Sequence, residues 1–432
     1  MSGFDLIKQN PYYQILRATF KCIMEKNSKD KSQPEAERVL YAKATYGEAE
    51  KEAVNKVLET PEQLVGGKYT DEFEAAVANT FGKEIGVMTN SGSSANMLAI
   101  QALPITEGAE IITPITTFST TVAPIVQNNH VPVFLDIDIG TYQINIGQIE
   151  NAITDRTEAI MIPALAGNIP NWPLLQKIAD DNDLYLIEDS ADTIGAVIQG
   201  EPTGVFTDVS TTSFYGSHVI TAFGGGGMVC FNDSALANDA KKIRAWGRKS
   251  AVDEDVSIDD RLQTQLGDIT YDSKFVFDKV GYNFLPLEAS AAFGLKQLDR
   301  LEEFAIRRQE NFEELSEFFI KYNKWFILPE ERDDVETCWL AYPLTITDAA
   351  PFSRVDVVKY LEENNIQTRS LWTGNILRHP GFEDINCKVP FDTPNANNVM
   401  KNAFVIGCHQ SLTDNQMEYM KSMFRLFFDE RS

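Results

Sequence analysis

The stretch "TTSFYGSHVITAFGGGGMV", residues 211–229, joins two expected β-strands through a loop that carries reactive side chains. β-Branched and apolar residues favour strands at 208–214 and 227–231. The four glycines at 224–227 indicate a close-approach turn, because they lack the spacing and the following helix of a nucleotide fingerprint. Ser213 offers a hydroxyl to a phosphate, and His218 has an unperturbed pKa suited to proton transfer. A structural role for this histidine stays open at this point.

Five more strands are expected upstream of this stretch, at 84–89, 110–113, 131–137, 158–165 and 183–189. Helical or turn segments separate most of them, and one such helix begins near Thr70, the expected N-cap, and stops at Gly82. This alternation predicts an α/β fold with a large, mainly parallel sheet that helices bury on both faces.

The pattern of expected helices and strands changes after Gly281. Residues 287–322 predict one long helical stretch that bridges two domains. Strands at 338–346, 366–372 and 403–409, with helices capped by Ser353 and Thr413, predict a compact α+β unit. We therefore expect an N-terminal extension (1–45), a large domain (46–300) and a small C-terminal domain (301–432). Apolar residues of the extension recur at roughly helical spacing and are expected to pack on the body: Tyr12, Leu16, Phe20 and Ile23.

Composition excludes several classes of protein. The formal net charge of −25 disfavours nucleic acid as a partner. The sequence contains neither a signal-peptide core nor an apolar run of membrane-spanning length, which predicts a cytoplasmic protein without a membrane segment. Its 5 cysteines are dispersed without a CxxC pair, so neither a disulfide framework nor a metal site is expected.

Two strand ends carry further polar groups. "TNSGSSANMLAI" (89–100) runs from a strand into a helix, where free amides and hydroxyls make an anion site, although such turns also serve only as caps. "LYLIEDSAD" (184–192) ends its strand in Glu188 and Asp189. A carboxylate at that edge of a parallel sheet pairs well with a protonated pyridine, and also commonly caps the next turn.

In their order these stretches resemble the DegT/DnrJ/EryC1/StrS sugar aminotransferase family of vitamin-B6-dependent enzymes, from about residue 45 to the C-terminus. The resemblance implies the fold-type I, aspartate aminotransferase-like architecture and a pyridoxal 5′-phosphate (PLP) cofactor. It implies that Asp189 binds the pyridinium and that Asn283 reaches the cofactor phosphate of a neighbouring subunit, which makes a homodimer. Its remaining implied cofactor-binding residues are Gly92, Ser93, Phe118, Asp192 and Ser213.

His218 stands where this family has its cofactor-binding lysine, which narrows the resemblance to the 3-dehydratases of dideoxysugar and lipopolysaccharide O-antigen biosynthesis. "SFYGSH" (213–218), "GYNFLPLE" (281–288) and "TGNILRHPGF" (373–382) carry that likeness. It implies a lyase that uses pyridoxamine 5′-phosphate (PMP) to remove the C3 hydroxyl of a nucleotide-linked 4-keto-6-deoxyhexose. His218 and Asp189 would be catalytic, Asn375 and Arg248 would bind substrate, and L-glutamate would restore PMP.

Some members of that branch also carry an iron–sulfur cluster fed by a reductase, and "AWGRKS" (245–250) resembles them. Ser190 and Ala191 follow Asp189, and residues 248–260 contain no cysteine, so we expect neither a cluster nor another metal. Leu285 occupies a position that is basic in these relatives, which leaves the sugar and nucleotide open. An ordinary sugar aminotransferase and a non-catalytic protein that keeps the fold remain the alternatives.

Overall fold

The computed structural model describes residues 38–252 and 257–431. Residues 1–39 and 40–432 form separate units, and the fold below is that of the second. The packing predicted for Tyr12, Leu16, Phe20 and Ile23 lies outside the described residues. The predicted boundary between large and small domains, at residue 300, coincides with a break between two helices of the second unit.

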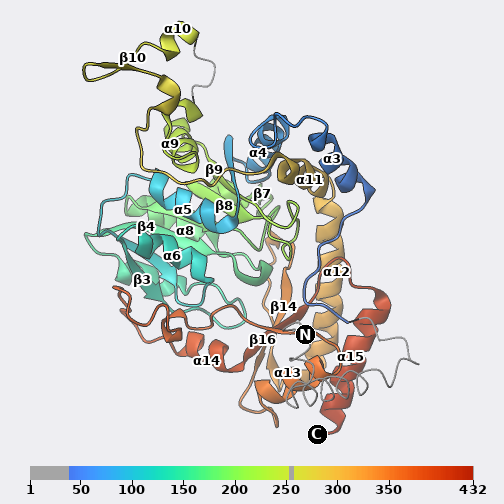
Figure 1. The fold of residues 1–432 in the computed structure, drawn as a ribbon. Coiled ribbons are helices and arrows are strands. Elements are labelled where there is room, and N and C mark those ends of the chain that lie inside the picture. The colour runs from blue at the N-terminus through green and yellow to red at the C-terminus, as the bar shows by residue number, and fades with distance from the viewer. Residues whose placement is uncertain (1–37, 253–256, 432) are drawn as a thin grey trace, which may run out of the picture. The chain divides into compact units, whose positions relative to one another are not determined.

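A seven-stranded sheet forms the centre of this unit (Figure 1). Its order is β1-β9-β8-β5-β4-β2-β3, and β9 runs antiparallel to both of its neighbours while the other pairs are parallel. All seven strands predicted upstream of Gly281 are members of it, so the α/β expectation is confirmed. The strands are β1 (Ile85–Thr89), β2 (Glu110–Pro114), β3 (Val131–Leu135), β4 (Thr157–Pro163), β5 (Tyr185–Asp189), β8 (Val209–Ser213) and β9 (Gly227–Phe231).

Both faces of the sheet are buried, because alternate side chains of each strand enter different apolar clusters. Ile111 and Ile187 pack with α5 (Gly92–Ala102) and α9 (Ser234–Arg244). Their neighbours Ile112 and Leu186 pack with α8 (Trp172–Asp181) on the opposite face. Helices α4 (Lys68–Thr80) and α6 (Ser119–Gln127) complete the layers. Strands buried on both faces explain why the sequence shows continuous apolar runs.

The expected cap at Thr70 is wrong. Helix α4 begins at Lys68 after Gly67, and Thr70 is buried inside its first turn. The carboxylate of Glu288 accepts the backbone N–H groups of Tyr69 (2.5 Å) and Thr70 (3.2 Å), and the Thr70 hydroxyl donates to it as well (2.6 Å). A residue distant in sequence therefore caps this helix, which a local pattern does not reveal.

The long helical stretch after Gly281 is two helices, α11 (Glu288–Leu298) and α12 (Leu301–Phe319), that separate at Asp299. Beyond them lies a four-stranded sheet in the order β12-β14-β16-β15. Its strands are β12 (Phe326–Ile327), β14 (Ala341–Ile346), β15 (Arg369–Ser370) and β16 (Ala403–Gly407). The caps predicted at Ser353 and Thr413 are confirmed, for α13 (Arg354–Glu363) and α15 (Asp414–Asp429).

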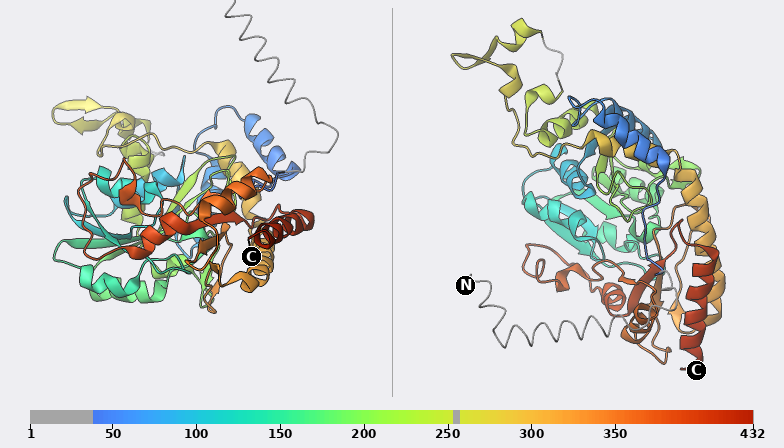
Figure 2. Two further views of the ribbon diagram at one scale, coloured as in Figure 1. Left: turned by 90° about the horizontal axis from the view of Figure 1, so that it is seen from below. Right: turned by 45° about the vertical axis from the view of Figure 1, so that its right-hand side comes forward.

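Helices α12 and α15 lie side by side (Figures 1 and 2), linked by the ion pairs Arg307–Asp414 and Lys421–Glu314 at 2.7 Å each. The smaller elements are α3 (Glu48–Leu58), α7 (Ile149–Ala152), α10 (Ile258–Arg261), α14 (Pro394–Asn402), β6 (Val197–Ile198), β7 (Glu201–Pro202), β10 (Thr264–Leu266), β11 (Ile269–Tyr271) and β13 (Val335–Glu336). Among the described helices we find none whose length and apolarity would let it cross a bilayer.

Candidate active site

A cavity of about 840 Å³ opens at the carboxyl ends of β4, β5 and β8, the edge at which parallel sheets collect ligands. The four-stranded sheet and its loops close the opposite side. Seven of the predicted site residues line this one cavity: Gly92, Ser93, Phe118, Asp189, Asp192, Ser213 and His218. The fold therefore brings together four stretches that are dispersed over more than a hundred residues of sequence.

The N-terminus of α5 and the end of β8 meet at one corner of the cavity. A Cβ added at Gly92 would lie 2.5 Å from the Ser213 Cβ, and one at Gly227 would lie 2.4 Å from the Ser91 carbonyl carbon. Glycine at both positions thus permits the close approach that the glycine run predicted. Ser91 caps the helix by accepting the Ser94 N–H at 3.2 Å. The result is a helix N-terminus beside a serine hydroxyl, which suits a phosphate.

Asp189 ends β5 at the floor of the cavity and is 6% exposed. Its carboxylate accepts hydrogen bonds from three neutral donors: the Asn96 amide (2.8 Å), the Thr121 hydroxyl (2.7 Å) and the Ala191 N–H (3.3 Å). Burial raises the pKa of Asp189 above its ordinary value, and the donors from Thr121 and Asn96 oppose that rise. A buried carboxylate that faces a cavity in this way suits a cationic donor such as a protonated pyridine.

Two other predicted cofactor-binding residues differ in burial. Asp192 is 5% exposed and accepts the Ala166 N–H at 3.1 Å, and burial raises its pKa to about 8. Burial thus favours the neutral form of this carboxyl group, which can donate as well as accept a hydrogen bond. Phe118 precedes α6 and exposes 51% of its surface, so its ring is free to cover a ligand.

His218 lies half-buried on the loop after β8. Its Nδ1 lies 3.2 Å from the carbonyl oxygen of Ser213, and a carbonyl oxygen accepts a hydrogen bond only from a nitrogen that carries a hydrogen. Nδ1 therefore carries the hydrogen, and the lone pair is on Nε2. Burial lowers the pKa of His218 to about 4, which keeps the imidazole neutral near pH 7. A neutral imidazole with a free Nε2 lone pair has the properties of a general base.

Three predicted residues lie outside the lining of this cavity. Asn283 is exposed and pairs with Ala245 in an isolated β-bridge. The Arg248 guanidinium stacks 4.4 Å from the Trp246 ring centroid. Asn375 is buried, where it accepts the Leu377 N–H (3.1 Å) and donates to Asn397 (3.0 Å). The ligand contacts proposed for them stay predictions.

Five residues that line the cavity were not predicted as site residues from the sequence: Asn96, Thr121, Arg369, Trp372 and His379. Asn96 follows Gly92 by one helical turn, so its place on the same helix face as the phosphate corner was a usable signal. The other four lie on α6, on β15 and on the loop after β15. Only the tertiary fold brings these elements to the cavity. Among the described lining residues, Arg369 carries the only guanidinium or ammonium group.

Comparisons with known proteins agree with this architecture. The sequence profile of the DegT/DnrJ/EryC1/StrS aminotransferase family matches residues 44–425. The chain belongs to that family. Lipopolysaccharide biosynthesis protein RfbH of Salmonella typhimurium is 37% identical over 84% of this chain and 86% of its own. The dTDP-4-dehydro-2,6-dideoxy-D-glucose 3-dehydratase of Saccharopolyspora spinosa is 35% identical over 83% and 80%.

Solved structures show the same fold. A GDP-4-keto-6-deoxymannose 3-dehydratase with a trapped PLP–glutamate geminal diamine has a TM-score of 0.80 and 30% identity, and it covers 89% of this chain and 99% of its own. The cavity is lined by a helix N-terminus beside a serine hydroxyl, an exposed aromatic ring and a buried carboxylate. The chemistry of these groups suits the phosphate, the ring and the ring nitrogen of PLP.

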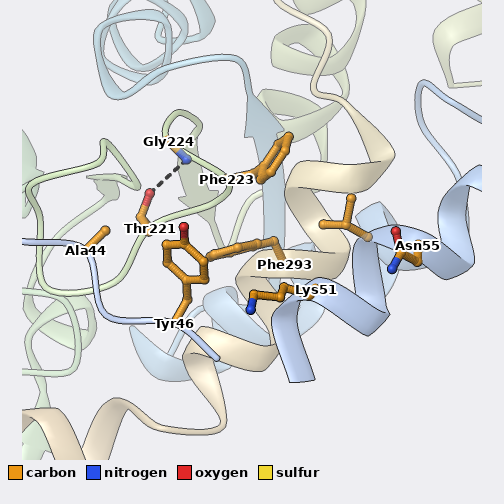
Figure 3. Close-up of a pocket in the computed structure, with 9 residues that line it drawn as sticks. Ala44, Tyr46, Lys51, Asn55, Thr221, Phe223, Gly224 and Phe293 are labelled. Carbon is orange, nitrogen blue, oxygen red and sulfur yellow. Dashed lines mark hydrogen bonds between the residues drawn. The ribbon is translucent and has the colours of Figure 1, made fainter. Parts of the chain in front are cut away.

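A second cavity of about 600 Å³ borders the first, and Gly224 lines both. Figure 3 shows its aromatic wall, in which the Phe293 ring lies 5.6 Å from that of Tyr46 and 5.8 Å from that of Phe223. The ammonium of Lys51 in its lining is paired with Glu48 at 2.6 Å. Within the described ranges, the carboxylates and imidazoles suited to proton transfer, such as Asp189 and His218, line the first cavity and not the second.

The described cysteines are poor metal ligands. Burial raises the pKa of Cys338 to about 11 and that of Cys408 to about 12, and it raises that of Cys230 further. A thiol with a raised pKa stays protonated, whereas a metal binds the thiolate. Ser190 donates its hydroxyl to Glu188. In the ranges that the structure describes, no group of three or more His, Cys, Asp and Glu side chains is placed to hold a metal ion.

Proposed function

We propose that this enzyme is a PMP-dependent 3-dehydratase of a nucleotide-linked 4-keto-6-deoxyhexose, with the cofactor restored by L-glutamate. The observation that carries the proposal is the group at the reacting position. His218 lines the cavity where a cofactor-binding lysine would be expected, with its Nδ1 hydrogen engaged by Ser213 and its pKa lowered to about 4. Two relatives reported above are named as 3-dehydratases.

The residues of this chain would divide the work. Gly92, Ser93 and Ser213 would hold the phosphate, Phe118 would cover the ring, and Asp189 would keep the proton on the ring nitrogen. When bound, the cofactor would supply an amine for the sugar ketone and a conjugated ring that accepts electrons. His218 would take the proton at C4′ through Nε2 and then return it to the C3 hydroxyl, which would leave as water. Histidine forms no imine, so the cofactor amine stays available to the sugar.

The rival function is an ordinary nucleotide-sugar aminotransferase, which would return a 4-amino sugar with its C3 hydroxyl intact. Both reactions use the same fold and the same phosphate corner, so the fold alone does not separate them. The neutral histidine favours the dehydratase, because transamination in this family's usual form needs a lysine to exchange with the substrate. A non-catalytic protein would not need a neutral base beside a buried carboxylate.

The decisive experiment supplies PLP, glutamate and a set of nucleotide-linked 4-keto-6-deoxyhexoses (GDP, CDP and dTDP), then identifies the products. We expect a 3-deoxy-4-keto sugar and one ammonia for each keto sugar consumed. A 4-amino sugar without ammonia release would instead establish the aminotransferase. No change in any substrate, with PLP bound, would support the non-catalytic alternative.

We further propose that the enzyme is a homodimer and that turnover needs no iron. Exposed apolar side chains surround Asn283, namely Phe277, Val280 and Tyr282, as expected of an interface. Asn283→Ala should then weaken PLP binding, and sedimentation should give a dimer. Anaerobic treatment with iron and sulfide should add no visible absorption, and a reductase with NADH should not increase turnover.

A further inference from the structure

The two oxygens of the Asp189 carboxylate are engaged unequally. Oδ2 accepts hydrogen bonds from the Asn96 Nδ2 at 2.8 Å and from the Thr121 Oγ1 at 2.7 Å. Among the residues that the structure describes, the one donor to Oδ1 is the Ala191 N–H, at a long 3.3 Å. One oxygen is therefore occupied by strong donors, while the other keeps its capacity for a ligand in the cavity.

The Asn96 amide has one chemically sensible orientation. Its Oδ1 accepts the Thr211 hydroxyl at 2.6 Å, and its Nδ2 donates both to Asp189 and to the Thr120 carbonyl at 3.2 Å. A flipped amide would set its oxygen against these two acceptors. The side chains of Thr211, Asn96 and Asp189 thus form a chain of hydrogen bonds whose direction is fixed.

These hydrogen bonds are buried and join different helices and strands. Asn96 lies on α5 and is 3% exposed, Thr211 lies on β8 and is 1% exposed, and Thr121 lies on α6 and is fully buried. Hydrogen bonds are electrostatically stronger away from water, and donors to a carboxylate favour its ionised form. Loss of the Asn96 donor would therefore make the carboxylate more basic and leave it held less firmly, by Thr121 and Ala191.

We propose that Asn96 is a positioning residue that keeps Asp189 ionised and presents its Oδ1 to the ring nitrogen of PLP. The shared proton then resides on the ring nitrogen, and the ring is a stronger electron acceptor. Thr211 acts one step further away, because it fixes the Asn96 amide. The inference rests on the proposed function in one respect, since it requires PLP with its ring nitrogen at Asp189.

The test measures where that proton lies. PLP labelled with ¹⁵N in the ring is bound to each variant, and its ¹⁵N chemical shift distinguishes a protonated from a neutral ring nitrogen. Asn96→Leu replaces the amide with an apolar side chain of similar size. Thr211→Val removes only the hydroxyl that orients the amide. Thr212→Val is the matched control, because this neighbouring buried threonine donates to the Ser190 carbonyl at 2.9 Å and does not touch Asp189.

We expect a mostly protonated ring nitrogen in wild type and in Thr212→Val, a mostly neutral one in Asn96→Leu, and an intermediate value in Thr211→Val. The kcat should fall about tenfold or more in Asn96→Leu and less in Thr211→Val. In a double-mutant cycle, Thr211→Val should add little once Asn96 is replaced. Thermal unfolding of each variant separates these effects from loss of fold, and Thr211→Val carries the test if Asn96→Leu does not fold.

The outcomes separate the inference from the function on which it rests. If wild type and Asp189→Asn give the same ¹⁵N shift, PLP does not bind as proposed and the site assignment fails. If Asp189→Asn neutralises the ring nitrogen while folded Asn96→Leu and Thr211→Val keep the wild-type shift, Asp189 is correctly assigned and the role of Asn96 is wrong.

Discussion

The two walls of the cavity differ in how firmly their side chains are held. The large-sheet wall consists of Asn96 in the middle of α5, Asp189 and Ser213 at the ends of β5 and β8, and His218 on the loop after β8. The C-terminal wall consists of Arg369, Trp372, Thr373 and His379, which lie on the short edge strand β15 and the loop after it. Arg369 is exposed, whereas Asp189 is 6% exposed.

This difference between the walls suggests a division of roles, with catalysis in the large-sheet wall and ligand recognition in the C-terminal wall. Groups that move protons need fixed geometry, which the packed sheet supplies to Asp189 directly and to His218 through its hydrogen bond to the Ser213 carbonyl at the end of β8. Groups that recognise a ligand are often placed on loops. His379 shows the limit of this division, because its Nε2 donates to the Thr373 carbonyl at 2.9 Å and so orients the ring within its own loop. Substitutions in the first wall should therefore change kcat, and substitutions in the second should change KM.

The largest effect is expected for His218→Asn. Loss of the general base should lower kcat by about 10²–10⁴-fold, because general acid–base groups contribute that much. The release of ammonia measures the elimination. Equilibrium dialysis should find that the affinity for PLP is nearly unchanged. His218→Lys is the companion variant, and its amine should capture PLP covalently, which is visible in the absorption spectrum. A His218→Asn enzyme within a few fold of wild type would remove the histidine from the mechanism.

Asp189→Asn should follow, with kcat lower by about 10²–10³-fold. The amide keeps the shape of the carboxylate but removes the charge that stabilises a protonated ring nitrogen. The melting temperature should change little, because Asn96 and Thr121 still have an oxygen to which they donate. Turnover near the wild-type rate would show that Asp189 caps a turn and does not bind the cofactor.

Arg369→Gln tests the other wall. Its guanidinium carbon lies 4.9 Å from the Tyr41 ring centroid, and it is the cation that an acidic ligand would meet in this lining. We expect KM for an anionic substrate to rise about tenfold with kcat nearly constant, and high salt to reduce the difference. Arg369→Lys should recover part of the affinity. An equal fall in kcat would contradict the division between the walls.

The smallest effect concerns stability beneath the C-terminal wall. His409 is 2% exposed, donates from Nε2 to the Leu40 carbonyl (3.1 Å) and accepts the Ser411 N–H at Nδ1 (3.2 Å). Burial lowers its pKa to about 3, so below pH 6.5 the unfolded chain binds a proton that the folded chain does not. This contribution to stability is complete above pH 6.5 and declines as the pH falls towards 3.

The measurement is the melting temperature as a function of pH. His409→Gln removes the titrating group, so its melting temperature should decline less than that of wild type between pH 6.5 and 4, by about 3 °C at pH 4. Parallel curves for the two proteins would mean that His409 is protonated in the folded state.

The sequence by itself determined the central sheet and pointed to Asp189, Ser213 and His218 in the large-sheet wall. Strands buried on both faces are mostly apolar along their length and end where polar residues begin, so the run before Asp189 could be recognised in the sequence. The stretch after Val209 could be recognised from its β-branched threonines. The glycines beside Ser91 and Ser213 could also be recognised in the sequence, because a close backbone approach excludes residues with a side chain. His218 stood out because its position is fixed relative to the strand before it.

Only the tertiary structure decided the contacts between distant segments. Glu288 caps α4 across more than two hundred residues, so the local signal at Thr70 was misleading. Asn96 and Thr121 meet at Asp189, and Thr211 meets Asn96, because α5, α6 and β8 converge beside the end of β5. Arg369 and His379 reach the cavity because the four-stranded sheet packs against it. Periodicity records which face of an element is buried, whereas the partner of a buried polar group depends on how the elements pack.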